Sequence, residues 1–426
     1  MAQANTSVSE VGAKVGKGRL IQRRWEVLLV VAIALLLIVV FPLILSNFRL
    51  GLLGRFLCLS IVALGIDLIW GFTGLLSLGH GIFFAIGGYV IAMNLQLQSL
   101  SEGSIPDFFS LYGVSELPAF WRPFYSFPVT LIAIVVIPSI IAGLLGYLVF
   151  RNRIRGVYFS ILTQAALVVF FNFFNGQQEL INGTNGLKTN TTELFGQSVG
   201  GDGMQFTFYC VTVVLLALTY GLCRWLTSGR FGRMLIAIRD DENRVRFSGY
   251  DPTAFKVLVF AVSGGIAGVA GALYTVQSGI VSPQYMSIAF SIEMVIWVAV
   301  GGRASLVGAI IGALAVNWGR ALLSESYPEI WLFFQGALFL IVVTVLPDGI
   351  IGWFRYQAAD DLRSLFGKPQ RVNTYPRLEV DETVKQEAEI YTKPTVARPI
   401  DPTSDPTSDP TIKPSSKSNV ELGDRP

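Results

Sequence analysis

The chain has 426 residues, of which 52% are hydrophobic and only 14% are charged, and its net charge at pH 7 is +3. Soluble domains carry about 25% charged residues, so this chain lacks the charge to cover the surfaces of the two or three soluble domains that its length would allow. The composition therefore excludes a soluble enzyme, a nucleic-acid-binding protein and a disulfide-rich secreted module.

The N-terminal segment, residues 1–24, is polar and basic and is followed by an apolar run. Val27 to Leu45 holds 19 consecutive uncharged residues, close to the ~20 that a helix needs to cross a bilayer. A signal peptide would have a shorter apolar core and a small-residue cleavage site. We therefore interpret residues 1–24 as a cytoplasmic segment and residues 25–46 as a retained first membrane helix.

Further apolar segments predict an all-α integral membrane protein with about ten transmembrane helices over residues 25–354. The expected spans are 25–46, 51–70, 73–95, 128–150, 156–175, 206–226, 256–279, 288–301, 303–323 and 330–353. The segment 288–301 is short for a complete crossing. Residues 355–426 are rich in Pro, Thr, Ser, Asp and Lys. Such a composition cannot bury enough apolar surface to offset chain entropy, so this segment is predicted to be a disordered cytoplasmic tail.

The distribution of Lys and Arg predicts the orientation of the chain. With the N-terminus inside, the cytoplasmic segments hold 27 of the 32 basic residues, and the outside segments hold the other five: Arg49, Arg55, Arg122, Lys188 and Arg320. Cytoplasmic loops carry the excess of basic residues in membrane proteins. The pattern therefore predicts that both termini are cytoplasmic, and it makes residues 96–127 and 176–205 periplasmic loops.

Glycine is concentrated within the predicted spans. Gly264, Gly268 and Gly271 are spaced so that they share one face of a helix, and Gly308 and Gly312 repeat the spacing. Small residues let membrane helices approach closely, so this pattern favours tight helix packing.

The sequence carries no set of residues typical of catalysis. It has no Gly-x4-Gly-Lys-Ser/Thr phosphate loop, so any ATP that drives this protein must be bound by another chain. Its one histidine, His80, lacks the partners that a metal site needs, and is expected to be a packing or helix-end residue. We therefore expect no catalytic residue, no metal site and no cofactor.

Polar residues inside the predicted spans are candidates for a translocation path. Glu293 and Asp67 are ionisable, and such residues within a membrane are functional candidates by default. The alternative is that each pairs with a neighbouring helix end or with an arginine such as Arg303. Gln164 and Asn172 are uncharged candidates for the same path, although hydrogen bonding between helices is the commoner role of such residues.

One predicted cytoplasmic loop is much longer than a connection requires. Roughly 28 residues separate the spans on either side, whereas two to eight would suffice. Residues 237–247 are predicted to form a short helix, ended by Gly249 and Pro252. The mixed charges and apolar residues of this loop indicate a docking surface for a soluble partner. Its candidate docking residues are Arg239, Asp240, Asp241, Glu242, Asn243, Arg244, Arg246 and Gly249.

Three segments together resemble the permease subunits of the ABC importers for branched-chain amino acids and urea. They are Gly71-Phe-Thr-Gly-Leu-Leu-Ser-Leu-Gly-His-Gly-Ile-Phe-Phe-Ala-Ile-Gly-Gly-Tyr89, Phe260-Ala-Val-Ser-Gly-Gly-Ile-Ala-Gly-Val-Ala-Gly-Ala-Leu-Tyr274 and Gly301-Gly-Arg-Ala-Ser-Leu-Val-Gly308. The resemblance covers roughly residues 50–353. It implies that the long loop forms the coupling helix that docks on an ATPase. It also implies two ATP-binding subunits, a second permease subunit, a periplasmic solute-binding protein and a location in the bacterial inner membrane.

The docking loop departs from the usual pattern of the amino-acid branch, Glu-x-Ala-Ala followed by Gly. Glu242 and Gly249 are present, but Arg244-Val-Arg-Phe-Ser248 replaces the alanines. This form and the segment 293–303 look more like the urea-type permease, and the scarcity of charge within the spans also favours a neutral solute. The expected solute is therefore urea, with a branched-chain amino acid or a short amide as the alternative.

Two other classes of membrane protein are less well supported. An ion-coupled secondary transporter would need acidic or histidine relays within the bundle, and only Glu293 and Asp67 qualify. An integral membrane enzyme would need His, Asp or Glu clustered at the membrane surface, and the sequence shows no such cluster.

Overall fold

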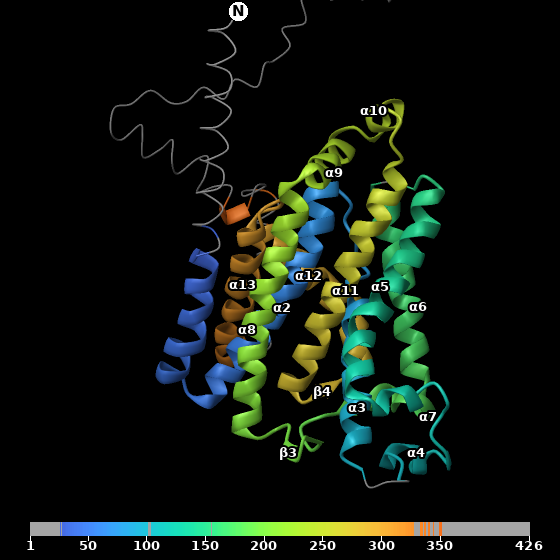
Figure 1. Cartoon of the computed structure of the whole chain (residues 1–426), viewed down its shortest axis with the longest axis vertical. Helices are drawn as coiled ribbons and strands as arrows, with labels where there is room; N and C mark the ends of the chain where they lie inside the picture. Colours follow the sequence, from blue (N-terminus) through green and yellow to red (C-terminus); the bar gives the residue numbers. More distant parts are fainter. Residues whose placement is uncertain are drawn as a thin grey trace, which may run out of the picture. The chain divides into compact units, whose positions relative to one another are not determined.

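A computed structural model describes residue 26, residues 28–100, 104–154 and 156–327, and scattered positions between 333 and 351. Seven helices in this part are long and apolar enough to cross a membrane. They are α2 (Asn47–Thr73), α3 (His80–Gln98), α5 (Phe127–Arg151), α6 (Val157–Gly176), α8 (Asp202–Ser228), α11 (Pro252–Ser278) and α13 (Leu306–Ser326) (Figure 1). Two shorter apolar helices are Leu28–Ile44 and α12 (Ile288–Gly301).

Nine of the ten predicted spans therefore correspond to a helix. The tenth, 330–353, falls largely outside the described residues, as do the N-terminal segment 1–24 and the tail 355–426. The total of ten spans and the disorder of the tail stay predictions.

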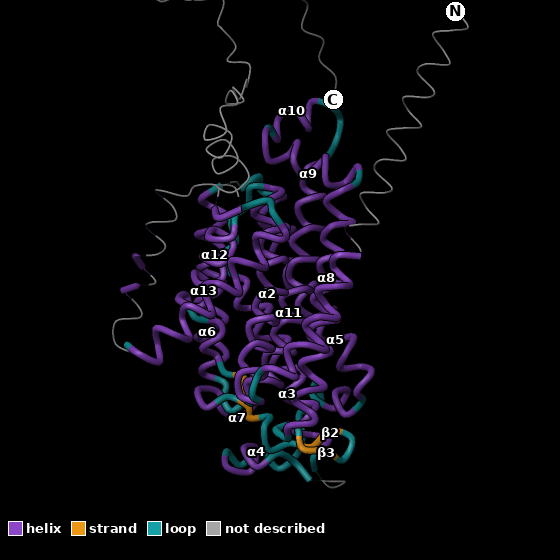
Figure 2. The backbone as a smooth tube through the Cα atoms, turned by 90° about the vertical axis from the view of Figure 1, so that its left-hand side faces the viewer, coloured by secondary structure: helices purple, strands orange, loops and turns teal. Residues whose placement is uncertain are grey.

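Short elements lie at the two ends of the bundle (Figures 1 and 2). α9 (Arg230–Asp240) and α10 (Glu242–Phe247) lie at one end. At the other end are α4 (Asp107–Leu111), α7 (Gln178–Ile181) and the hairpin of β2 (Glu193–Leu194) and β3 (Gln197–Ser198). The basic-residue bias assigned these same two groups to opposite sides of the membrane. The absolute orientation stays a prediction.

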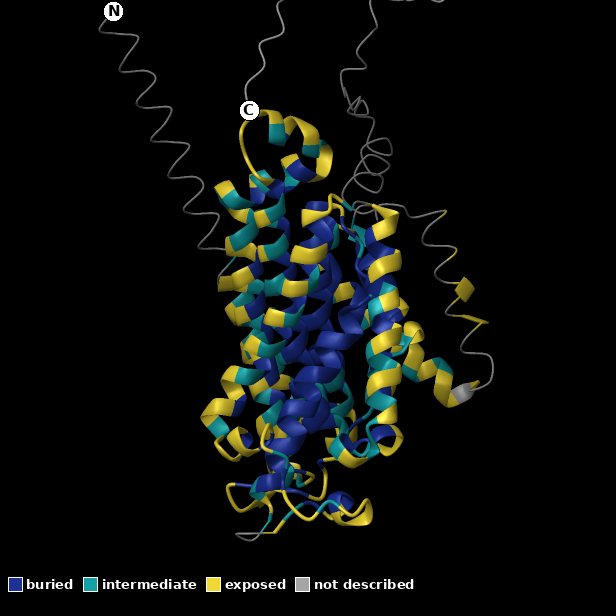
Figure 3. Cartoon of the chain, turned by 90° about the vertical axis from the view of Figure 1, so that its right-hand side faces the viewer, coloured by how far each residue is buried: buried dark blue, intermediate teal, exposed yellow. Residues whose placement is uncertain are grey.

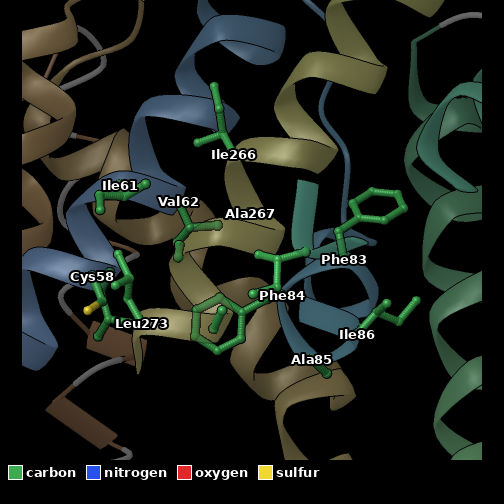
Figure 4. Packing of buried hydrophobic residues seen from close by; sticks show 14 of the residues in the cluster. Cys58, Ile61, Val62, Phe83, Phe84, Ala85, Ile86, Ile266, Ala267 and Leu273 are labelled. Atoms are coloured by element: carbon green, nitrogen blue, oxygen red, sulfur yellow. The ribbon is translucent and has the colours of Figure 1, made fainter. Parts of the chain in front are cut away.

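The described helices form a buried centre and an outer layer (Figure 3). Most residues of α2, α3 and α11 are buried, and so is most of α12. α5, α6 and α8 expose apolar side chains over most of their length, which is suited to contact with lipid. Residues of the three long central helices pack together in the core shown in Figure 4, including Cys58, Ile61, Val62, Phe83, Phe84, Ala267 and Leu273.

The glycines of α11 allow this close packing, as predicted. A Cβ atom on Gly271 would lie 1.8 Å from the carbonyl oxygen of Phe84, and one on Gly268 would lie 2.5 Å from that of Ile134. On α3, a Cβ on Gly87 would lie 2.0 Å from the carbonyl oxygen of Gly268. Backbone therefore meets backbone at these crossings, and only glycine fits.

Two of the central helices are followed by irregular chain. α2 and α11 each have 27 residues and each end at a glycine in the left-handed region, Gly74 (φ 74°) and Gly279 (φ 79°). Residues 74–79 then lead into α3. Residues 279–287, which contain β4 (Ile280–Val281) and η3 (Pro283–Met286), lead into α12. β4 pairs antiparallel with β1 (Leu187–Lys188).

The starts of α3 and α12 meet well inside the bundle. His80, the first residue of α3, places Nε2 2.7 Å from the hydroxyl of Ser263, near the middle of α11. A Cβ on Gly81 would lie 2.9 Å from the hydroxyl of Ser291, in the first turns of α12. Discontinuous helices of this kind mark solute sites in many transporters, because irregular backbone at membrane depth must be covered by protein or line a water-filled cavity.

His80 joins three helices. The Ser263 hydroxyl donates to the carbonyl oxygen of Gly65 on α2 at 2.6 Å, so His80 Nε2 donates to Ser263. The ring also packs edge-on against Phe83 and Phe260. This confirms the predicted role of His80 in packing at a helix end.

Candidate translocation path and docking element

Four charged residues lie well inside the described apolar helices: Arg55, Asp67, Glu293 and Arg320. The sequence predicts Asp67 and Glu293 as path candidates, whereas the count of basic residues placed Arg55 and Arg320 in outside segments. Both arginines are flanked by apolar residues, as in Leu53-Gly-Arg55-Phe-Leu57. This pattern could have identified them as charged residues within a membrane helix.

The side chain of Asp67, a residue of α2, contacts a tight turn between α12 and α13. Its side chain is fully buried, and its Oδ1 accepts a hydrogen bond from the backbone N–H of Ala304 at 2.7 Å. Ala304 has a φ of 58°, an unusual conformation for a residue with a side chain. Gly71 leaves room for this turn, because a Cβ there would lie 2.4 Å from the Ala304 nitrogen. Asp67 therefore fixes the turn against the end of α2.

Glu293 faces the protein interior and is only 8% exposed. Both of its carboxylate oxygens accept hydrogen bonds from Nη1 of Arg320, at 2.8 and 2.7 Å. Its partner is therefore Arg320 on α13, in place of the expected Arg303. The Arg303 guanidinium instead lies 5.2 Å from the ring centre of Trp70. The sharp turn at residues 302–305 reverses the direction of the chain, so α13 packs along α12. This packing brings Arg320 to Glu293.

Aromatic rings from four elements, α3, α11, η3 and α12, lie near the start of α12. The Phe84 and Phe290 ring centres are 5.3 Å apart, those of Tyr274 and Tyr285 are 5.4 Å apart, and those of Tyr285 and Phe290 are 5.5 Å apart. The tertiary structure thus pairs Glu293 of α12 with Arg320 of α13, and it joins aromatic rings of α3, α11, η3 and α12 near the start of α12.

The two uncharged path candidates lie elsewhere, on α6. Gln164 is half-buried, whereas Asn172 is exposed and donates to the carbonyl oxygen of Val168 on its own helix at 2.9 Å. The same helix supplies two polar contacts that the sequence did not reveal. Ser160 donates to the carbonyl oxygen of Leu76 at 2.6 Å, and the Thr163 hydroxyl accepts from the backbone N–H of Leu78 at 3.1 Å. Both support the irregular segment 74–79.

The predicted docking loop folds into two helices, in place of the single helix expected over 237–247. The chain breaks at Asp241, whose Oδ1 accepts hydrogen bonds from the backbone N–H groups of Asn243 and Arg244 at 3.0 and 3.2 Å. Such a cap begins a new helix, here α10. Gly249, at φ 84°, ends the turn that follows α10, and Asp251 caps α11 through the N–H of Thr253.

Several charged residues of this loop hold it to the bundle. Arg239 donates to the carbonyl oxygen of Gly71 at 3.0 Å, and it also pairs with the exposed Asp240 at 3.2 Å. Glu242 accepts from Arg246 at 2.9 Å and from Lys256 at 2.5 Å. Lys256 is only 4% exposed. These residues fix the position of α9 and α10.

Other residues at the tip of α10 face outward. Phe247 is 92% exposed and Tyr250 is 54% exposed, and the side chain of Arg244 is 87% exposed. The outward surface is therefore an aromatic and basic tip, defined here as Arg244, Phe247 and Tyr250. Phe247 and Tyr250 were absent from the predicted docking set, and the tertiary structure alone shows their exposure.

The described residues form a helical bundle with irregular segments inside it and a helical loop at one end, an arrangement typical of membrane transport proteins. Residues 48–343, more than half of the chain, match the family model described as "Branched-chain amino acid transport system / permease component". The chain belongs to this family. It is accordingly a multi-pass inner-membrane transport component and not an enzyme.

Individual relatives agree with the family model. The chain is 27% identical to the high-affinity branched-chain amino acid transport system permease protein LivM of Salmonella typhimurium, over 78% of this chain and 75% of the relative. It is 26% identical to the LivH permease protein of Escherichia coli, over 69% and 91%. It is 23% identical to a probable LivM of Methanocaldococcus jannaschii, over 68% and 89%. No solved structure matches the chain.

Proposed function

We propose that this chain is a permease subunit of an ABC importer for branched-chain amino acids. Two partner ATP-binding subunits hydrolyse ATP, a second permease subunit completes the path, and a periplasmic binding protein delivers the solute. The observation that carries the proposal is the exposed tip of α10, which is held on the bundle by the bonds of Arg239 and Glu242. It gives the chain a docking element for an ATPase, in a sequence with no phosphate loop of its own.

The tip of α10 has the properties of an interface anchor. Glu242 bonds Arg246 within α10 and Lys256 at the start of α11, so α10 is joined directly to a central helix. An exposed aromatic side chain such as Phe247 is costly in water, and aromatic residues and arginine are the commonest anchors in protein interfaces. The surface therefore suits a pocket on a soluble partner.

Amino acids are a better supported solute than urea. The three relatives above are named for branched-chain amino acid transport, and none of these names supports the urea expected from the form of the docking loop. The membrane helices also contain more charge than the sequence analysis assigned to them, because they include Arg55 and Arg320 as well as Glu293. A zwitterion needs such charges, whereas neutral urea needs only hydrogen bonds.

Uptake measurements test the solute and the energy source together. In a strain lacking this protein, we expect uptake of labelled leucine to be lost and uptake of labelled urea to be unchanged. Leucine uptake by the complemented strain should stop when ATP is depleted. Loss of urea uptake with normal leucine uptake would reverse the solute assignment. Uptake that survives ATP depletion but collapses with the ion gradient would indicate a secondary transporter.

Phe247→Ala tests the docking element. Because Phe247 is 92% exposed, the substitution should leave the amount of folded permease unchanged and should lower permease-stimulated ATP hydrolysis at least tenfold. The matched control is Phe195→Ala, which removes an aromatic side chain that is 74% exposed at the opposite end of the bundle. ATP hydrolysis at the wild-type level in the Phe247 variant would place docking on another surface.

A further inference from the structure

The exposed residues of α6 differ in kind from those of α5 and α8. In residues 129–144 of α5 and 208–218 of α8, every exposed residue is Val, Leu or Ile. These two surfaces suit lipid. α6 is different, because Asn172 is exposed on it and Gln164 is half-buried. Its outer side therefore carries two polar amides among apolar residues.

The two amides lie within the apolar length of α6. The helix has 20 residues and is therefore about 30 Å long, close to the thickness of a bilayer core. Gln164 is seven residues from the first residue, Val157, which places it roughly 10 Å inside the helix. Asn172 is four residues from the last residue, Gly176, or roughly 6 Å inside. A polar side chain at such a depth is costly in hydrocarbon unless it is hydrogen-bonded.

The described chain satisfies these amides only in part. Asn172 Nδ2 donates to the carbonyl oxygen of Val168 at 2.9 Å, but no described residue bonds its Oδ1. The amide of Gln164 has no hydrogen bond to a described residue either. Side-chain amides in membrane helices are commonly satisfied by a neighbouring helix. The remaining partners of Asn172 must come from another chain, because this residue faces away from its own bundle.

We propose that the outward face of α6 is the contact surface for a transmembrane helix of the second permease subunit. This inference rests on the proposed function, because it takes that subunit as the partner. The outward face comprises the exposed residues Tyr158, Leu162, Ala165, Val169, Asn172 and Gly176. The partner helix supplies hydrogen bonds to Asn172 and to Gln164, which lies beside Ala165.

The outward face has the spacing of a helix–helix contact. Its six residues alternate in steps of four and three, which is the repeat by which two helices pack at a small crossing angle. Ala165 near its middle and Gly176 at its end are small, so a partner backbone can approach closely. Tyr158 and Val169 are 76% and 66% exposed. The face thus combines close approach with apolar side chains that a partner would cover.

The opposite face of α6 is occupied by this chain. The Phe159 ring centre lies 5.1 Å from that of Phe150 and 5.5 Å from that of Phe260. Ser160 and Thr163 hold the irregular segment 74–79. α6 lies at the edge of the bundle (Figure 1). A second subunit on the outward face would therefore be separated from segment 74–79 by a single helix.

Photocross-linking tests the contact in the complete importer, reconstituted in phosphatidylethanolamine–phosphatidylglycerol vesicles. Benzoylphenylalanine is placed at Val169 or, as the matched control, at Ile132 on α5. Both residues are β-branched, and they are 66% and 64% exposed. Irradiation should give an adduct with the combined mass of the two permease subunits, in at least tenfold higher yield from position 169. Equal yields, or lipid adducts alone at position 169, would overturn the inference, and so would an adduct of two copies of this chain.

Asn172→Leu provides a second arm that does not need the photoreactive group. If lipid covers α6, the substitution should be harmless, whereas a subunit contact predicts at least fivefold less second permease subunit recovered with affinity-tagged chain. The membrane level of this chain should stay unchanged. The matched control is Asn152→Leu, because Asn152 also donates to a carbonyl oxygen four residues earlier, that of Leu148, but follows the last residue of α5.

The wild-type importer separates the two ways in which this test can fail. If the tagged wild-type chain recovers no second permease subunit, the proposed function fails. If the wild-type chain and the Asn172→Leu variant recover it equally, the proposed function stands and the inference about α6 is wrong.

Discussion

At the scale of single residues, the central glycines fix how closely the helices approach. Gly271→Ala would place a Cβ atom 1.8 Å from the carbonyl oxygen of Phe84. Backbone lies on both sides of this contact, so α3 and α11 must separate. We expect destabilisation by about 3 kcal/mol or more, at the upper end of the cost of overpacking. The amount of permease in the membrane and the melting temperature of the purified protein should both fall.

Gly143→Ala is the matched control for this prediction. A Cβ there has the side chain of Ala261 as its nearest neighbour, at 3.6 Å, which is an ordinary contact. Alanine also favours a helix over glycine by about 1 kcal/mol. The melting temperature should be unchanged or slightly raised. If the melting temperatures of Gly271→Ala and Gly143→Ala fall equally, steric contact is not the cause of the destabilisation.

Asp67 makes a second prediction at this scale. Asp67→Ala removes the acceptor of the Ala304 N–H and leaves that group without its bond in the turn between α12 and α13. An unsatisfied buried donor costs about 1–3 kcal/mol, so the melting temperature should fall. Asp67→Asn keeps an acceptor oxygen, so its melting temperature should fall less than that of Asp67→Ala. If the two variants melt at the same temperature as the wild type, the bond does not hold the turn.

At the scale of elements, the Glu242 carboxylate joins α10 to the start of α11. Glu242→Ala removes the partner of both Arg246 and Lys256. Removing one member of a buried ion pair typically costs about 3–5 kcal/mol, and Arg246 is partly exposed, so we expect the lower part of this range locally. Hydrogen exchange of the backbone amides over residues 242–249 should accelerate, while exchange in α2 should not change.

The control for this element is Arg244→Ala, because the Arg244 side chain is 87% exposed and pairs only at the surface with Asp241 among the described residues. Surface pairs contribute about 0–1 kcal/mol, so exchange over 242–249 should stay close to that of the wild type. Unchanged exchange in the Glu242 variant would mean that α10 is held by packing of its buried Val245 instead.

At the scale of the whole molecule, the polar tail is predicted to be dispensable for transport. The tail lies outside the described residues, and the prediction rests on its composition, which is too polar to form a packed core. A chain ending near residue 375 should insert normally and should take up solute at close to the wild-type rate. Loss of uptake at normal membrane levels would identify the tail as a required partner site.

The sequence by itself determined that the protein spans a membrane, where nine of its helices lie, which glycines pack helices together and where the loop with α9 and α10 falls. These properties are local, because the length of an apolar run, the spacing of small residues and the charge of a loop are read within one segment. Only the tertiary structure decided the pairing of Glu293 with Arg320, the start of α3 halfway along α11 and the helix break at Asp241. Each depends on which helices become neighbours, and in a membrane nearly every helix is apolar on all sides, so hydrophobic periodicity cannot specify the neighbours.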